Sequence, residues 1–101
     1  MFSATGAGFH ITFDNGWTIS VQWGPGNYGD NRMKSLEEEN FAEVLSSMES
    51  RTAEIMAWDA NDVHWDFSVG SRVGLLGQGL LTKGWVKPDE LIGYIQEISQ
   101  I

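Results

Sequence analysis

Residues 9–23 read FHITFDNGWTISVQW and carry the clearest structural pattern in the chain. Apolar side chains take every second position on both sides of the Asp14-Asn15-Gly16 triplet. They are Phe9, Ile11 and Phe13 before it and Trp17, Ile19, Val21 and Trp23 after it. A period of two is typical of strands buried on one face, and Asn-Gly accepts the positive φ of a tight turn. The sequence therefore predicts a β-hairpin with one apolar face.

The next nine residues, GPGNYGDNR at 24–32, form a loop that few ordinary turns require. Such a loop can present backbone N–H groups, an aromatic ring and a cation together, as a binding site does. In its sharper form the hypothesis is a nest around an anion, with Arg32 as a bidentate partner and Tyr28 or Trp23 stacked on a base. The candidate ligand-binding residues are Trp23, Gly24, Gly26, Asn27, Tyr28, Asn31 and Arg32. The alternative is a wide connection whose glycines simply take positive φ.

Further along, Ser35 and Glu38 match a capping box, and apolar residues from Leu36 to Met48 fall on one side of a helix. We expect an amphipathic helix near 35–49. Segments 52–58 and 63–67 predict a second hairpin, joined by the turn-forming residues 59–62. Residues 70–84 are rich in glycine and leucine and are open to three interpretations: a bent strand, a third hairpin or a lid. Exposed leucines there would favour self-association.

The chain ends in a second predicted helix. Pro88 suits a first helical position, acidic residues follow it, and a stripe of apolar residues comes next. The stripe comprises Leu91, Tyr94, Ile95 and Ile98. We expect residues 1–101 to form a single α+β domain: an antiparallel sheet of two or three hairpins, an amphipathic C-terminal helix across one face, and the mid-chain helix.

The formal net charge of −8 belongs to one segment. Residues 35–66 hold nine acidic residues and only Arg51, whereas the segments on either side are each neutral. This balance argues against direct binding of duplex DNA, which needs a basic face, and leaves the 24–32 loop free to meet an anion. An acidic face suits a basic protein partner, including one that normally binds nucleic acid. The candidate partner-binding residues are Glu37, Glu38, Glu39 and Glu43, with a solvated helix face as the alternative.

Several chemistries find no pattern in the sequence. It has no cysteine and no phosphate-loop spacing. Two histidines without a metal-binding spacing predict no metal site, and His64 with Asp66 is a weak candidate for a hydrolytic pair. We therefore expect no catalytic residue, no metal and no cofactor. With neither a membrane-length apolar run nor a leader pattern at residues 1–10, the expected location is the cytoplasm.

Three blocks carry a resemblance: GFHITFDNGWTISVQWGPGNY, AEIMAWDANDVHWDF and KGWVKPDELIGYI. They resemble small phage and prophage proteins that share an ITF-NG-TISVQ-G-GNY block, an AEI-WD block and a GW-DE helix start. The resemblance covers about half of the chain and implies a viral accessory protein in the host cell. That group often reads GNYC, whereas Gly29 follows Tyr28 here, so no role of that cysteine carries over.

Two classes of function follow. The first is a non-enzymatic inhibitor of a host protein, a bacterial defence component in the manner of anti-CRISPR proteins, acting through an acidic surface in 35–66. The second is a protein that sequesters an anionic nucleotide in the Gly24–Arg32 loop. A structural or oligomerisation module is a further alternative, and a homo-oligomer fits each of them. An enzyme comes last, because no nucleophile and base pair is present.

Overall fold

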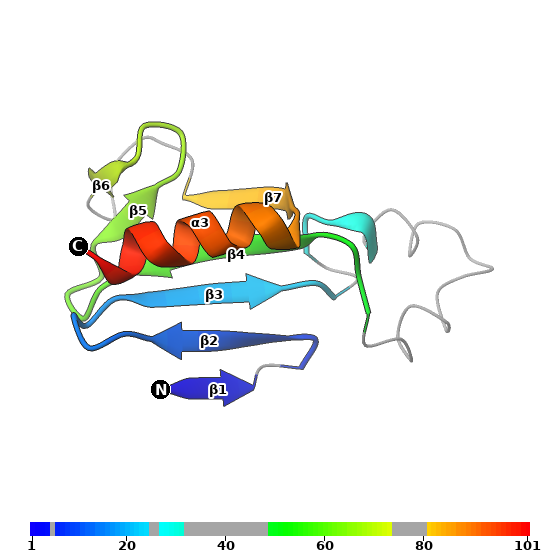
Figure 1. Cartoon of the computed structure of the whole chain (residues 1–101), viewed down its shortest axis with the longest axis horizontal. Coiled ribbons are helices and arrows are strands. Elements are labelled where there is room, and N and C mark those ends of the chain that lie inside the picture. Colours follow the sequence, from blue (N-terminus) through cyan, green and yellow to red (C-terminus); the bar gives the residue numbers. More distant parts are fainter. Residues whose placement is uncertain (5, 25–26, 32–48, 74–80) are drawn as a thin grey trace.

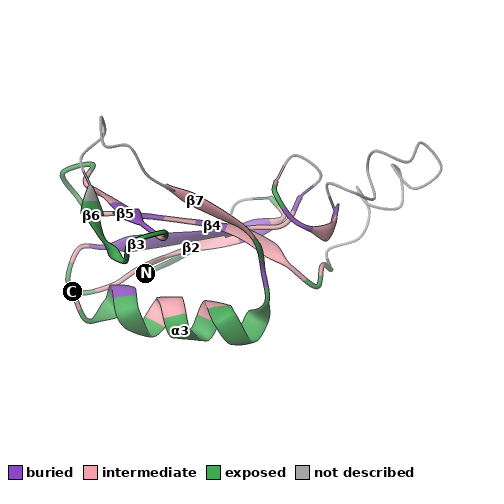
Figure 2. Ribbon diagram, turned by 90° about the horizontal axis from the view of Figure 1, so that it is seen from above, coloured by how far each residue is buried: buried purple, intermediate pink, exposed green. Residues whose placement is uncertain are grey.

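The computed structural model describes residues 1–4, 6–24, 27–31, 49–73 and 81–101. Within these ranges seven strands form one antiparallel sheet, and the helix α3 (Pro88–Ser99) lies against one of its faces (Figures 1 and 2). The predicted antiparallel sheet and C-terminal helix are confirmed. The mid-chain helix expected over 35–49 falls almost entirely on residues 32–48, which lie outside the described residues.

Six strands follow one another across the sheet in chain order, and the seventh joins from the side (Figure 1). The six are β1 (Phe2–Ala4), β2 (Gly8–Thr12), β3 (Thr18–Gln22), β4 (Ala53–Trp58), β5 (His64–Asp66) and β6 (Ser71–Val73). The seventh, β7 (Thr82–Val86), pairs with β4. The sheet therefore grows mainly between sequence neighbours, with one long connection from β3 to β4.

The predicted first hairpin is confirmed by strands β2 and β3, which pair from Gly8↔Gln22 to Thr12↔Thr18. Its turn needs Gly16, which takes φ 87°. Asn15 stabilises the turn twice, since its Oδ1 accepts from the N–H of Trp17 at 3.0 Å and its Nδ2 donates to the Ile98 carbonyl at 2.9 Å. The hairpin turn is thus attached to the C-terminal end of α3.

The second edge of β4 is shared by two strands. Along its first half β4 pairs with β7, and at its last residue Trp58 pairs with His64 of β5. The predicted second hairpin is therefore present but short. Strand β6 and the first part of β7 lie in the glycine- and leucine-rich segment at 70–84, and residues 74–80 between the two strands lie outside the described residues.

The pairing of β4 with β7 contains a β-bulge. Its register shifts between Ala53 and Ile55, opposite a stretch of β7 in which Trp85 takes φ 52°. Positive φ is strained for a large L-residue and persists only where the surroundings fix it. The bulge turns the Trp85 side chain outward, leaving it 45% exposed.

The core lies between α3 and the sheet. Its buried side chains are Trp17, Ile19, Val21, Ile55, Ala57, Trp65, Val86 and Ile98. From the helix, the predicted stripe of Leu91, Tyr94, Ile95 and Ile98 faces these residues, and Ile98 is fully buried. Apolar burial of this kind is the main favourable term in folding. It confirms the core role expected for Trp17 and for the odd-numbered residues of β3.

The opposite face of the sheet is more polar. Thr12 and Thr18 lie opposite each other there, with their hydroxyl oxygens 2.8 Å apart. The ring of Trp58 lies near two imidazoles, with ring centres 5.3 Å from His10 and 6.4 Å from His64. Both histidines therefore pack against the ring of Trp58.

Candidate functional site

The loop at 24–31 is held by hydrogen bonds to its own chain. Asn27 accepts from the Gly24 N–H at 3.0 Å through Oδ1, and the Asn27 N–H donates to the Gly24 carbonyl at 3.1 Å. The side chain of Asn31 is buried at 2% exposure, and its Nδ2 donates to the carbonyls of Trp23 at 2.6 Å and Glu49 at 3.2 Å. Both asparagine side chains therefore stabilise the loop, since the polar atoms of a buried amide need hydrogen-bond partners.

Glu54 of β4 supplies a carboxylate to this loop. Its Oε1 accepts from Nδ2 of Asn27 and its Oε2 from the N–H of Tyr28, both at 3.3 Å. Further along, the N–H of Asp30 donates to Oγ1 of Thr52 at 2.9 Å, and that hydroxyl donates to Oδ1 of Asp30 at 2.9 Å. The N–H groups that a nest would offer to an external anion at Gly24, Tyr28 and Asp30 already have acceptors within the chain.

Tyr28 joins this loop to the bulge of β7. The N–H of Trp85 donates to the Tyr28 carbonyl at 2.8 Å, and the two aromatic rings lie with their centres 5.9 Å apart. Tyr28 is 46% exposed and Trp85 is 45% exposed, so each ring keeps about half of its surface in water. We call Tyr28 and Trp85 the aromatic pair. The loop at 24–31 and the β-bulge of β7 together position this pair.

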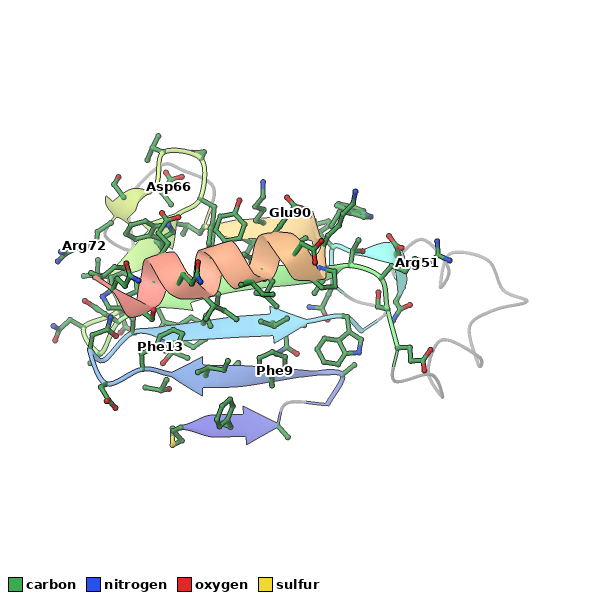
Figure 3. All side chains as sticks on the ribbon, viewed as in Figure 1. Phe9, Phe13, Arg51, Asp66, Arg72 and Glu90 are labelled. Atoms are coloured by element: carbon green, nitrogen blue, oxygen red, sulfur yellow. The ribbon has the colours of Figure 1, made fainter. Side chains whose placement is uncertain are left out.

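An open cavity of about 530 Å³ lies beside Trp85. It is lined by Asp30, Arg51, Thr52, Trp85, Lys87, Pro88 and Asp89. Arg51 and Lys87 are exposed cations, and Asp30 and Asp89 balance their charge within the same lining. Figure 3 places Arg51 on the segment leading into β4, beyond the start of α3. The cavity thus offers an aromatic wall and charges of both signs.

A second open cavity, of about 400 Å³, adjoins the first through Arg51, Thr52 and Pro88. Its wall is mostly apolar, with Phe9, Val21, Trp23, Val86 and Leu91 among the lining residues. Trp23 packs edge-on against Phe9, with ring centres 6.1 Å apart. Trp23 therefore packs at the end of the core, beside the loop for which the sequence predicts it as a stacking ring for a base.

The candidate ligand-binding residues divide into three groups. Tyr28 faces solvent; Trp23, Gly24, Asn27 and Asn31 lie in the loop framework around it. Gly26 and Arg32 lie outside the described residues, as do the candidate partner-binding residues Glu37, Glu38, Glu39 and Glu43. The structure brings the described members together around Tyr28.

Acidic residues of the described part also serve the fold. Asp59 caps its turn by accepting from the N–H groups of Asn61 and Val63 at 2.8 and 2.9 Å. Asp66 is 2% exposed and accepts from the N–H of Ser68 at 2.8 Å and from its hydroxyl. Together with Glu54, these residues accept hydrogen bonds within the described part of the chain. Part of the acidity of 35–66 therefore serves the fold instead of a contact surface.

Sequence reasoning missed Trp85, Arg51 and Lys87 as site residues. No pattern in KGWVK indicates the positive φ that Trp85 takes. The one available signal was the glycine before it: Gly84 is needed where the Tyr28 backbone crosses β7, since a Cβ there would lie 2.6 Å from the Tyr28 Cβ. Arg51 was noted only as a charge.

Comparison of the chain with protein-family models, curated proteins and solved structures yields no match. Within the described ranges, no three histidine, cysteine or carboxylate side chains gather as a metal site would require. No helix of that part of the chain is long and apolar enough to cross a membrane. The aromatic pair and its surroundings are therefore the features of the described residues that bear on function.

Proposed function

We propose that this chain acts by binding a partner protein, without chemistry of its own, and that the aromatic pair is central to the contact surface. One observation carries the proposal: Trp85 is held half exposed on a strained backbone at φ 52°. Strain of this kind is stored mostly at functional sites, and tryptophan, tyrosine and arginine dominate the binding energy of protein interfaces. Tyr28 and Arg51 supply the other two residue types beside it.

The partner we propose to test first is a bacterial defence component, because the sequence resembles phage accessory proteins. Such an inhibitor works in the cytoplasm of the host cell. The acidic residues Glu37, Glu38, Glu39 and Glu43, on the helix expected at 35–49, would add attraction to a basic partner. A hydrophobic and aromatic centre flanked by charge is the usual composition of a protein interface.

The test is an anti-defence assay in cells with variants of the aromatic pair. Trp85→Ala and Tyr28→Ala should each abolish protection, because truncation of a hot-spot residue weakens the binding free energy by about 2 kcal/mol or more. Ile92→Ala is the matched control, since Ile92 is 58% exposed on the outer side of α3. Reversal of the four glutamates to lysine, in a chain that keeps the aromatic pair, should also weaken protection. Full protection by both aromatic variants would overturn the proposal.

Sequestration of an anionic nucleotide is the second candidate, and the cavity beside Trp85 favours it. A volume of about 530 Å³ with an aromatic wall and two cations falls in the range of ligand sites. We rank it second because Asp30 and Asp89 offset the cations, and because the loop N–H groups already have acceptors. Melting temperatures measured against nucleotides and cyclic nucleotides test it. A ligand at 100 times its dissociation constant adds about 2.7 kcal/mol to stability.

A further inference from the structure

Strand β1 forms an outer edge of the sheet, farthest from β6 (Figure 1). It pairs with β2 on one side, and within the described part of the chain no strand pairs with its other side. Free strand edges are templates for another strand, and proteins blunt them with charged residues, proline or very short edge strands. Phe2–Ala4 is short, but it contains neither a charged residue nor proline. This edge is therefore open to pairing.

The hydrogen bonds of Met1 fix which backbone groups point outward. Met1 and Thr12 exchange two hydrogen bonds of 2.8 Å each, through the N-terminal nitrogen and the Met1 carbonyl. Pairs of this kind alternate along an antiparallel ladder, so Ser3 exchanges bonds with His10 and Phe2 does not with Ile11. The N–H and C=O groups of Phe2 and Ala4 consequently face the free edge.

The edge is also where two acidic chains can approach. Residues 1–13 contain no Asp, Glu, Lys or Arg in a chain of net charge −8. Phe2 is 81% exposed, and its pairing with Ile11 places it on the α3 face of the sheet, beyond the helix. Two copies meeting at this edge would avoid like-charge repulsion and would cover apolar surface.

We propose that two copies of this chain dimerise by antiparallel pairing of their β1 strands, with the twofold axis at Ser3. In this register Phe2 lies opposite Ala4 of the second copy, and each such pair exchanges two hydrogen bonds, giving four in all. The outward groups of Phe2 and Ala4 match one another only when Ser3 lies opposite Ser3 of the second copy. The two sheets become one continuous sheet.

The absence of cysteine gives a direct test of this register. Ser3 would face Ser3 of the second copy as a non-hydrogen-bonded pair, for which Cα atoms lie about 4.5 Å apart, within the range of a disulfide. Under mild oxidation Ser3→Cys should form a disulfide-linked dimer at least tenfold faster than Ser99→Cys, an exposed control on α3. Equal rates for the two variants would overturn the proposal.

Sedimentation of the unmodified chain over a range of concentrations supplies the second measurement. We expect a monomer–dimer equilibrium that Phe2→Pro shifts at least tenfold toward monomer. Proline removes the exposed ring of Phe2 and, of its hydrogen-bonding groups, only the outward N–H, so the bonds between β1 and β2 remain and the melting temperature should change little. Ile92→Ala, which removes a different exposed apolar side chain, should leave the equilibrium unchanged. A monomer at every concentration, or a dimer that Phe2→Pro leaves intact, would overturn the proposal.

Discussion

The backbone of Tyr28 crosses Gly84 so closely that a Cβ on Gly84 would lie 2.9 Å from the Tyr28 carbonyl oxygen. The same carbonyl accepts the N–H of Trp85 at 2.8 Å. The loop at 24–31 and the bulge of β7 are therefore joined at one point. Because Tyr28 and Trp85 are the two exposed rings of the candidate site, this contact controls how they stand relative to each other.

Gly84→Ala tests this contact. The added methyl group would also lie 2.6 Å from the Tyr28 Cβ, so either the loop or β7 must move, and we expect a loss of about 1–3 kcal/mol in unfolding free energy. Gly93→Ala is the control, since nothing lies within 4 Å of its Cβ and alanine favours a helix interior by about 1 kcal/mol. Urea unfolding measures both. A Gly84→Ala protein as stable as the parent would contradict the close crossing.

Glu54→Gln tests whether the carboxylate orders the loop. One of its two acceptor oxygens becomes an amide donor, so either Asn27 or the Tyr28 N–H loses its partner, at a cost of about 1 kcal/mol. Hydrogen exchange at the Tyr28 amide should accelerate. Asp62→Asn removes the same charge from the exposed turn at 59–62 and should leave that exchange rate unchanged. Equal exchange rates in both variants, together with unchanged stability of Glu54→Gln, would mean that Glu54 does not hold the loop.

The elements that the sequence predicts correctly are those whose apolar residues repeat at a regular spacing. The β2–β3 hairpin and α3 follow from the alternation around Asn15-Gly16 and from the stripe after Pro88, because periodicity reports which side of an element is buried. Strand β1 is three residues long and too short for any period. The sharing of β4 between β5 and β7 depends on pairing across the chain, which leaves no local signal.

The candidate site was predicted only in part, for the same reason. The composition of 24–32 located the loop and the exposed Tyr28, whereas its hydrogen-bond partners came from β4 and its aromatic neighbour from β7. Nothing near Glu54 in the sequence indicates that its carboxylate lies against a loop more than twenty residues earlier. The exposure of Trp85 depends on the β-bulge, which the sequence does not indicate. Contacts of this kind are set by the tertiary fold, and a single sequence does not encode them in any short window.

Asn15→Ala should loosen the attachment of α3 to the hairpin turn. The variant leaves the Ile98 carbonyl without the 2.9 Å hydrogen bond and the Trp17 N–H without its 3.0 Å bond. We expect a loss of about 1–3 kcal/mol in unfolding free energy and faster amide exchange in the last turn of α3. Asp14→Ala changes the neighbouring exposed residue of the same turn and serves as the control. If both variants lose the same stability, the side-chain bridge contributes nothing.

Substitution of Trp85 by two small residues separates backbone strain from recognition. Both Trp85→Gly and Trp85→Ala remove the ring and its contact with Tyr28, so we expect both to abolish partner binding in the anti-defence assay. They differ only in how they accept φ 52°, which costs an L-residue about 1–2 kcal/mol and glycine almost nothing. The glycine variant should therefore be more stable than the alanine variant by about 1 kcal/mol in thermal unfolding. The reverse order would show that position 85 is not held in the left-handed region, and the backbone strain that supports the proposed function would be absent.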